Sequence, residues 1–183
     1  MIENNLETYF KVATWTSPIV VIFLLILSAF FSGSETALTA SSRPKLRSMS
    51  DRGSVGAKKA LDITNDNESL IGTILLGNNI VNILATSLAT AYFVKLFGDK
   101  GIFLATFCMT VLILVFSELL PKTYAINNPE TAARRVAPLV LFFIYIFSPI
   151  IIFVRKFVQL LLSLIGLKID PNKQILASDE IAG

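Results

Sequence analysis

Three groups of polar residues interrupt long apolar stretches of this 183-residue chain. If those stretches cross a membrane, each group needs an explanation, because a charged side chain near the bilayer centre costs about 2.5–3.5 kcal/mol. Carboxylate, amide, hydroxyl and carbonyl oxygens are the ligands that hard cations such as Mg²⁺, Ca²⁺ or Na⁺ prefer. The pattern therefore indicates a cation site inside the membrane. The groups are Ser32-Gly33-Ser34-Glu35, Gly77-Asn78-Asn79 with Asn82, and Ser117-Glu118 with Pro121-Lys122.

Backbone oxygens are expected to contribute to this site. Pro121 has no N–H, so it leaves the carbonyl of Ser117, four residues earlier, without its helical partner. The spacing Ser32-x-x-Glu35 matches a capping box, which predicts that the first helix breaks at Ser32-Gly33 and then restarts. A broken helix exposes carbonyl oxygens, and these suit a cation.

The second group combines a possible backbone break with two amides. Gly77 offers the break, and Asn78 and Asn82, which are four residues apart, lie on one face of a helix. The sequence does not decide which of the asparagines is a ligand.

Packing and pairing give simpler explanations for part of the pattern. Small residues four apart often serve helix packing, and asparagines often bond between membrane helices. A Glu four residues before a Lys can form an ion pair, and a capping carboxylate needs no ligand. Helix packing would explain the pairs Ser28/Ser32 and Gly33/Ala37, and a bond between helices would explain Asn79. An ion pair would explain Glu118 with Lys122, and capping would explain Glu35.

The composition excludes several classes of function. Hydrophobic residues make up 54% of the chain, charged residues 16%, and the mean hydropathy is +0.68, which is typical of an integral membrane protein. There is no His, and Cys108 is the only Cys, so zinc sites, intrachain disulfides and His-based catalysis are excluded. A net charge of +3 without interleaved aromatic and basic residues gives no indication of a nucleic-acid partner. The sequence also lacks the paired carboxylates and the Ser/Lys dyad that an intramembrane enzyme would need, so we expect no enzymatic activity.

The elements expected to position the polar groups are all α-helical. Each of three apolar segments is long enough to cross a hydrocarbon core about 30 Å thick. A basic loop with two short helical pieces separated by Gly53 and Gly56 follows the first segment, and a tight turn at 98–101 follows the second. Pro138 and Pro149 divide a fourth apolar stretch, which we interpret as a proline-broken pair of helices at the cytoplasmic face. The crossings are 18–40, 70–97 and 102–120, the loop is 41–69, and the broken pair is 136–167.

The basic loop residues predict the orientation. With three crossings, 41–69 and 122–135 lie on the same side, and the positive-inside rule places that side in the cytoplasm. Residues 1–17 are then an extracytoplasmic segment, 18–167 the transmembrane domain, and 168–183 a cytoplasmic tail or linker to a missing domain. We therefore expect a multi-pass protein of the inner or plasma membrane with an external N-terminus.

Three ordered motifs carry a resemblance to a known family. FFSGSETALTA, LIGTILLGNNIVNILAT and FSELLPKTYA resemble the DUF21 transmembrane domain of the CorB/CorC and CNNM (cyclin M) magnesium transporters, over about residues 18–167. The resemblance implies a homodimer with three transmembrane helices, a belt of juxtamembrane helices, and cytoplasmic CBS domains in the full-length protein. It also implies Mg²⁺ transport, generally export coupled to inward Na⁺, through an inward-facing pocket at Ser32, Asn78 or Asn82, and Glu118.

Our leading hypothesis is a dimeric Mg²⁺ transporter in which Glu118 supplies the principal charge and Na⁺ occupies the same pocket or one beside it. The alternative is a membrane anchor and dimerisation module that senses Mg²⁺ or tethers a cytoplasmic regulator without moving ions. The candidate metal residues are Ser32, Gly33, Gly77, Asn78, Asn82, Ser117 and Glu118, with Ser34, Glu35, Asn79 and Lys122 as possible additions.

Overall fold

The computed structural model describes the backbone of residues 2–165 and the side chains of residues 17–165, and all regular secondary structure in this described part is helical. The predicted tail, 168–183, lies outside the described residues. The all-α prediction is thereby confirmed for residues 2–165. The elements are α1 (Ile2–Ala40), α2 (Arg43–Asp51), α3 (Val55–Asn65), α4 (Asn67–Phe97), α5 (Lys100–Leu112), the π-helix η1 (Ile113–Leu119), α6 (Leu120–Asn127) and α7 (Pro129–Leu164).

Four helical segments are long and apolar enough to cross a membrane: Ser17–Ala40, Asn67–Phe97, Lys100–Asn127 and Pro129–Leu164. The first three correspond to the predicted crossings, although the third continues through Pro121 to Asn127. The position of the fourth apolar stretch at the cytoplasmic face of the bilayer stays a prediction.

The prediction of a proline-broken pair over 136–167 is wrong in one respect, because α7 is one helix through both Pro138 and Pro149. A proline removes one backbone hydrogen bond and crowds the preceding turn, yet apolar helices tolerate it when the remaining bonds hold. The chain divides into two compact units, Met1–Ile146 and Phe147–Gly183. The side-chain contacts and the cleft described below all lie within the first unit.

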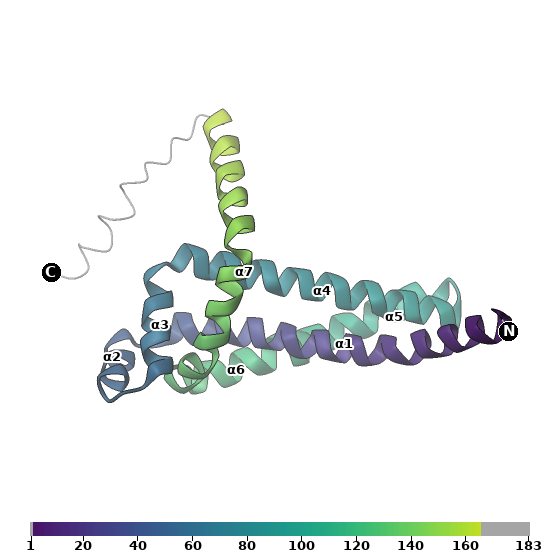
Figure 1. Ribbon diagram of the computed structural model, residues 1–183, viewed down its shortest axis with the longest axis horizontal. Helices are drawn as coiled ribbons and strands as arrows, with labels where there is room; N and C mark the ends of the chain where they lie inside the picture. The colour runs from purple at the N-terminus through teal and green to yellow at the C-terminus, as the bar shows by residue number, and fades with distance from the viewer. Residues whose placement is uncertain (1, 166–183) are drawn as a thin grey trace. The chain divides into compact units, whose positions relative to one another are not determined.

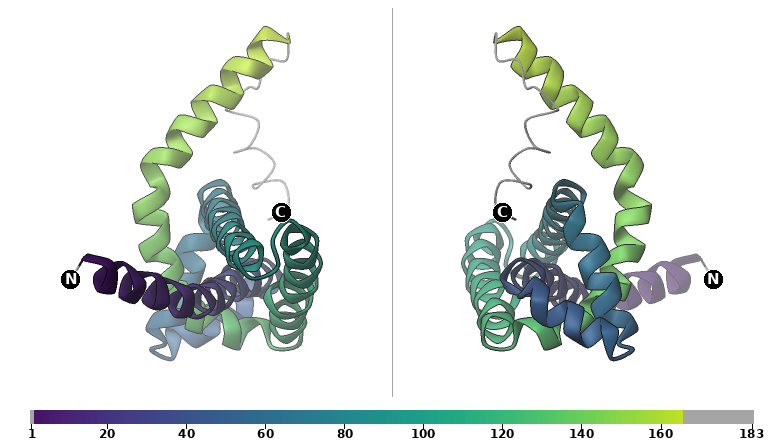
Figure 2. Two further views of the ribbon diagram at one scale, coloured as in Figure 1. Left: turned by 90° about the vertical axis from the view of Figure 1, so that its right-hand side faces the viewer. Right: turned by 90° about the vertical axis from the view of Figure 1, so that its left-hand side faces the viewer.

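The helices α1, α4 and α5 run side by side, with α4 antiparallel to the other two (Figures 1 and 2). In addition to α4, α1 packs against η1 and α6. Small buried residues permit this approach, among them Ser28 and Ser32 on α1 and Ala85 on α4. The predicted turn between α4 and α5 is confirmed at Gly98, whose φ of +63° favours glycine.

The basic loop folds as a helical hairpin at the end of α1 away from the N-terminus (Figure 1). Its two pieces, α2 and α3, are those predicted, and Ser54 caps α3 by accepting the Ala57 N–H at 3.3 Å. Lys45 on α2 forms an ion pair with Glu130 in the first turn of α7, with an N–O distance of 3.1 Å. The hairpin is therefore tied to the segment that follows α6.

Candidate cation site

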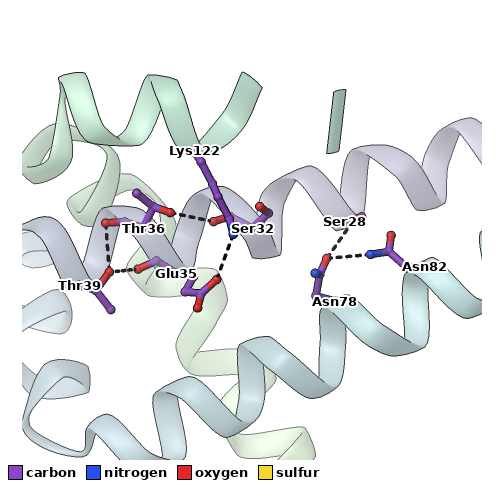
Figure 3. Close-up of polar contacts among 8 residues, drawn as sticks. All are labelled: Ser28, Ser32, Glu35, Thr36, Thr39, Asn78, Asn82 and Lys122. Atoms are coloured by element: carbon purple, nitrogen blue, oxygen red, sulfur yellow. Dashed lines mark hydrogen bonds and ion pairs between the residues drawn. The ribbon is translucent and has the colours of Figure 1, made fainter. Parts of the chain in front are cut away.

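A short chain of hydrogen bonds joins α1 to α4 in the middle of the helix bundle. The hydroxyl of Ser28 donates to Oδ1 of Asn78 at 2.8 Å, and the amide of Asn82 donates to the same oxygen at 3.5 Å (Figure 3). The helical spacing of Asn78 and Asn82 was predicted, whereas Ser28 was considered only as a packing residue. Its spacing of four residues from Ser32 was the available signal.

Two buried oxygens beside this chain have no hydrogen-bond partner among the described residues: Oδ1 of Asn82 and Oγ of Ser32, whose residue is 1% exposed. Leaving a buried polar group unpaired costs about 1–3 kcal/mol. A water molecule or a cation between the helices would remove that cost, so these oxygens are candidate ligands.

The first helix does not break at this point, and the capping-box prediction is wrong. α1 runs unbroken through Ser32 and Gly33, and the hydroxyl of Thr36 donates to the Ser32 carbonyl at 3.4 Å. In hydrocarbon a backbone group has no water to replace a lost bond, so a capping signal that starts a new helix in water is overridden. Unwound carbonyls at Ser32-Gly33 are therefore absent from the site.

The two glycines of the motifs serve close packing. A Cβ on Gly33 would lie 3.2 Å from Cβ of Pro121, and one on Gly77 would lie 2.5 Å from the ring of Phe31. α4 continues as a regular helix through Gly77, so the predicted break there is wrong as well. Both positions bring neighbouring helices together instead of exposing backbone oxygens.

Ser117 and Glu118 lie in the π-helix η1, a rare geometry that occurs often at functional sites. Its last turn is closed by the Leu120 N–H, which donates to the Val115 carbonyl five residues earlier. Pro121, which has no N–H to donate, follows in the first turn of α6. The buried Ser117 hydroxyl donates to the Leu25 carbonyl at 3.0 Å, which fixes η1 against α1.

Glu118 is half-buried and lines a cleft of about 320 Å³ between α4, α5 and η1. Within residues 17–165, no hydrogen bond or ion pair reaches its carboxylate. The alternative of a Glu118–Lys122 pair is not formed, because Lys122 pairs with Glu35 at 3.8 Å (Figure 3). The other lining residues are Thr86, Thr106, Met109, Thr110, Ile113 and Leu114.

The remaining candidates lie apart from these contacts. Asn79 is exposed on α4, and Ser34 is buried with an Oγ that has no partner in the described chain. The described residues contain no cluster of three or more His, Cys, Asp or Glu side chains that could hold a metal ion. A cation here would depend on one carboxylate together with neutral oxygens. The threonines beside Glu118 were missed by sequence reasoning.

Comparison with known proteins places these features in context. Residues 19–183 match the family described as the Cyclin M transmembrane N-terminal domain. The chain is 39% identical over 163 residues to a UPF0053 protein of Haemophilus influenzae, covering 89% of this chain and 39% of that protein. It is 37% identical over 144 residues to the UPF0053 inner membrane protein YfjD of Escherichia coli K12, covering 79% and 34%.

A more distant relative carries a functional name. The chain is 26% identical over 178 residues to the Polyamine export protein of Escherichia coli K12, covering 90% of this chain and 40% of that protein. The chain therefore spans about two-fifths or less of the length of these three relatives.

Proposed function

The chain belongs to the cyclin M family of transmembrane domains, and from this premise we propose that it is the transport domain of a Mg²⁺ exporter. It is a multi-pass membrane protein, with an inner membrane protein among its relatives. The proposal further includes a homodimer, an external N-terminus, coupling to inward Na⁺, and cytoplasmic CBS domains in the full-length protein.

The observation that carries the proposal is the unpaired carboxylate of Glu118. It lies in the third apolar segment, in a cleft, and no cation of the described chain neutralises it. A charged side chain in hydrocarbon carries a large free-energy cost, and for that reason it indicates a functional site. A transported cation supplies the missing partner.

Neutral oxygens complete the proposed Mg²⁺ site. Mg²⁺ needs several oxygens at about 2.0–2.1 Å and gives up its water reluctantly. The unpaired oxygens of Ser32 and Asn82 supply two of these, and Asn78 holds the Asn82 side chain in place. Ser117 has its hydroxyl hydrogen engaged by α1, so its oxygen remains able to accept a cation.

The test is Mg²⁺ flux in proteoliposomes, with and without an inward Na⁺ gradient. Glu118→Gln removes the charge and keeps the shape, so we expect flux to fall by about tenfold or more. Asp62→Asn, which changes an exposed carboxylate on α3, is the matched control and should leave flux unchanged. Equal flux in wild type and Glu118→Gln would rule the assignment out. Mg²⁺-dependent thermal stabilisation without any flux would favour the sensing or anchoring alternative.

Export of a polyamine is the second candidate, and the Polyamine export protein among the relatives favours it. A polyamine carries several ammonium groups that need separate partners. Glu35 and Glu118 are the only acidic residues within 18–40, 70–97 and 102–120, and Glu35 already pairs with Lys122. This charge count favours a small metal ion. Labelled spermidine in the same proteoliposomes separates the two cargoes.

A further inference from the structure

A pocket of about 210 Å³ lies between the end of α1, the hairpin of α2 and α3, and the start of α4. Figure 1 shows these four elements together at one end of the bundle. The apolar segment Ser17–Ala40 ends here and the segment Asn67–Phe97 begins here, so the pocket lies where hydrocarbon gives way to water. It shares no lining residue with the cleft beside Glu118, so a ligand in it would be distinct from the transported cation.

Arg43, the first residue of α2, lines this pocket and is held in place by α3. Its guanidinium donates to the Thr64 carbonyl at 2.6 Å and to Oδ1 of Asn65 at 3.2 Å. A guanidinium has five N–H donors, so these two bonds leave three for a ligand. Within residues 17–165, no carboxylate forms an ion pair with Arg43. It therefore presents a fixed positive charge, and phosphate is a group whose geometry a guanidinium matches.

Three hydroxyls that line the pocket can only accept hydrogen bonds. Thr39, Ser41 and Thr64 each donate to a backbone carbonyl three or four residues earlier, at 2.8, 3.0 and 3.0 Å. A hydroxyl has one hydrogen and two lone pairs, so each oxygen is left with lone pairs alone. These suit an N–H donor such as an ammonium group and do not suit a phosphate. The pocket thus offers donors to an anion and acceptors to a cation.

The apolar part of the lining continues onto the exposed surface of α4. Leu38 is buried in the pocket wall, whereas Ile71 is 48% exposed. Leu75, one turn further along the same face of α4, is 59% exposed. An apolar strip in the crossing segment that leads from a polar pocket fits a molecule with a polar head and a hydrocarbon chain.

We propose that the pocket binds the headgroup of phosphatidylethanolamine. The lipid phosphate accepts hydrogen bonds from Arg43, the ammonium group donates to the three hydroxyls, and an acyl chain lies along Ile71 and Leu75. The headgroup carries one negative and one positive charge, which correspond to the donors and acceptors of the lining. Phosphatidylcholine has the same phosphate but no N–H, and phosphatidylglycerol has no cation at all.

The charges near the pocket also favour a zwitterionic lipid over an anionic one. Asn67, the first residue of α4, lines the pocket, and its amide can donate to the phosphate. Asp66 and Glu68 flank it without lining the pocket, and Asp66 accepts the Ser69 N–H at 3.1 Å. These two carboxylates offset the positive charge of Arg43, so the site does not attract a net anion strongly.

The experiment is native mass spectrometry of the full chain, freed of lipid in detergent and titrated with dioleoyl forms of the three phospholipids. Arg43→Gln removes the phosphate partner. Thr39→Val/Ser41→Ala removes two ammonium acceptors and leaves the contacts of Arg43 with α3 in place, so it remains informative if Arg43→Gln does not fold. Arg47→Gln, an exposed residue of α2 outside the pocket, is the matched control.

We expect wild type to bind its first phosphatidylethanolamine about tenfold more tightly than either other lipid. Arg43→Gln should weaken phosphatidylethanolamine and phosphatidylcholine alike by about tenfold, since both carry the phosphate. Thr39→Val/Ser41→Ala should weaken only phosphatidylethanolamine, and Arg47→Gln should match wild type. The proposal is overturned if wild type binds the three lipids equally, or if either pocket variant binds phosphatidylethanolamine as wild type does.

Soluble phosphoethanolamine distinguishes a lipid from a free metabolite with the same headgroup. Without acyl chains it gains nothing from the apolar strip, so we expect it to displace the lipid only at concentrations about a hundredfold higher or more. Displacement at equal concentration would assign the pocket to a soluble ligand and overturn the lipid.

Discussion

Single side chains decide whether the polar groups act as ligands or as packing. Asn78 is the acceptor for both Ser28 and Asn82, so it holds α1 and α4 together and orients its neighbour. Asn79, the next residue, is exposed. The sequence could identify the asparagines as candidates by their spacing. It could not choose between Asn78 and Asn79, because the choice depends on which face of α4 meets α1.

Replacing Asn78 tests this assignment. Hydrogen bonds between membrane helices contribute about 0.6 kcal/mol on average and up to about 1.7 kcal/mol. With two bonds to lose, Asn78→Ala should lower the free energy of unfolding in detergent by about 1 kcal/mol, whereas Asn79→Ala should leave it unchanged. Denaturant titration followed by circular dichroism provides the measurement. Equal losses in the two variants would contradict the hydrogen-bond chain.

At the scale of the helices, apolar length is a reliable guide and local break signals are not. Hydropathy placed the three predicted crossings on helices. The hairpin of α2 and α3 followed from Gly53, whereas Gly56, also expected between the two pieces, lies inside α3. The breaks expected at Ser32-Gly33 and Gly77 came from capping and glycine rules learned in water, where the solvent replaces lost bonds. In a bilayer the backbone keeps its internal bonds, and the glycines are used for contact.

The contact of Gly77 with Phe31 gives a prediction for a helix pair. Phe31 is buried and packs against Phe143, with ring centroids 4.8 Å apart, so its ring has little room to move. Gly77→Ala places a methyl group against that ring and should cost about 1–3 kcal/mol of stability. In a Phe31→Leu background the same change should cost less. A double-mutant cycle measures the difference, and additive costs would show that the contact does not matter.

The π-helix η1 is the element that sequence reasoning missed altogether. Pro121 correctly marked a disturbance of backbone bonding, but the wide turn lies before it, over Ile113–Leu119. Nothing in the residue types of that stretch distinguishes i→i+5 from i→i+4 bonding. The position of Glu118 in one cleft with Thr106 and Thr110 therefore could not be predicted, and the candidate residues included neither threonine.

For the whole molecule, the arrangement of crossings is the main prediction. In a Cys108→Ala background, single cysteines at Ser54, between α2 and α3, and at Asp99, before α5, should react with a membrane-impermeant maleimide from opposite sides. Ser54→Cys should label in inside-out vesicles and Asp99→Cys in right-side-out vesicles. Ser163→Cys on α7 should label with Ser54→Cys if three segments cross. Labelling of positions 54 and 99 from one side would refute the proposed topology.

The continuity of α1 restricts how any ion could pass from one side to the other. Its 39 residues extend about 58 Å, nearly twice the thickness of the hydrocarbon core. A rod without a hinge cannot open at Ser32 by swinging one half against the other. For the proposed transport, we expect alternate exposure to come from rigid-body tilting of α1, or from sliding of α4 and α6 along it. The glycine contacts at Phe31 and Pro121 are the surfaces on which such sliding would occur.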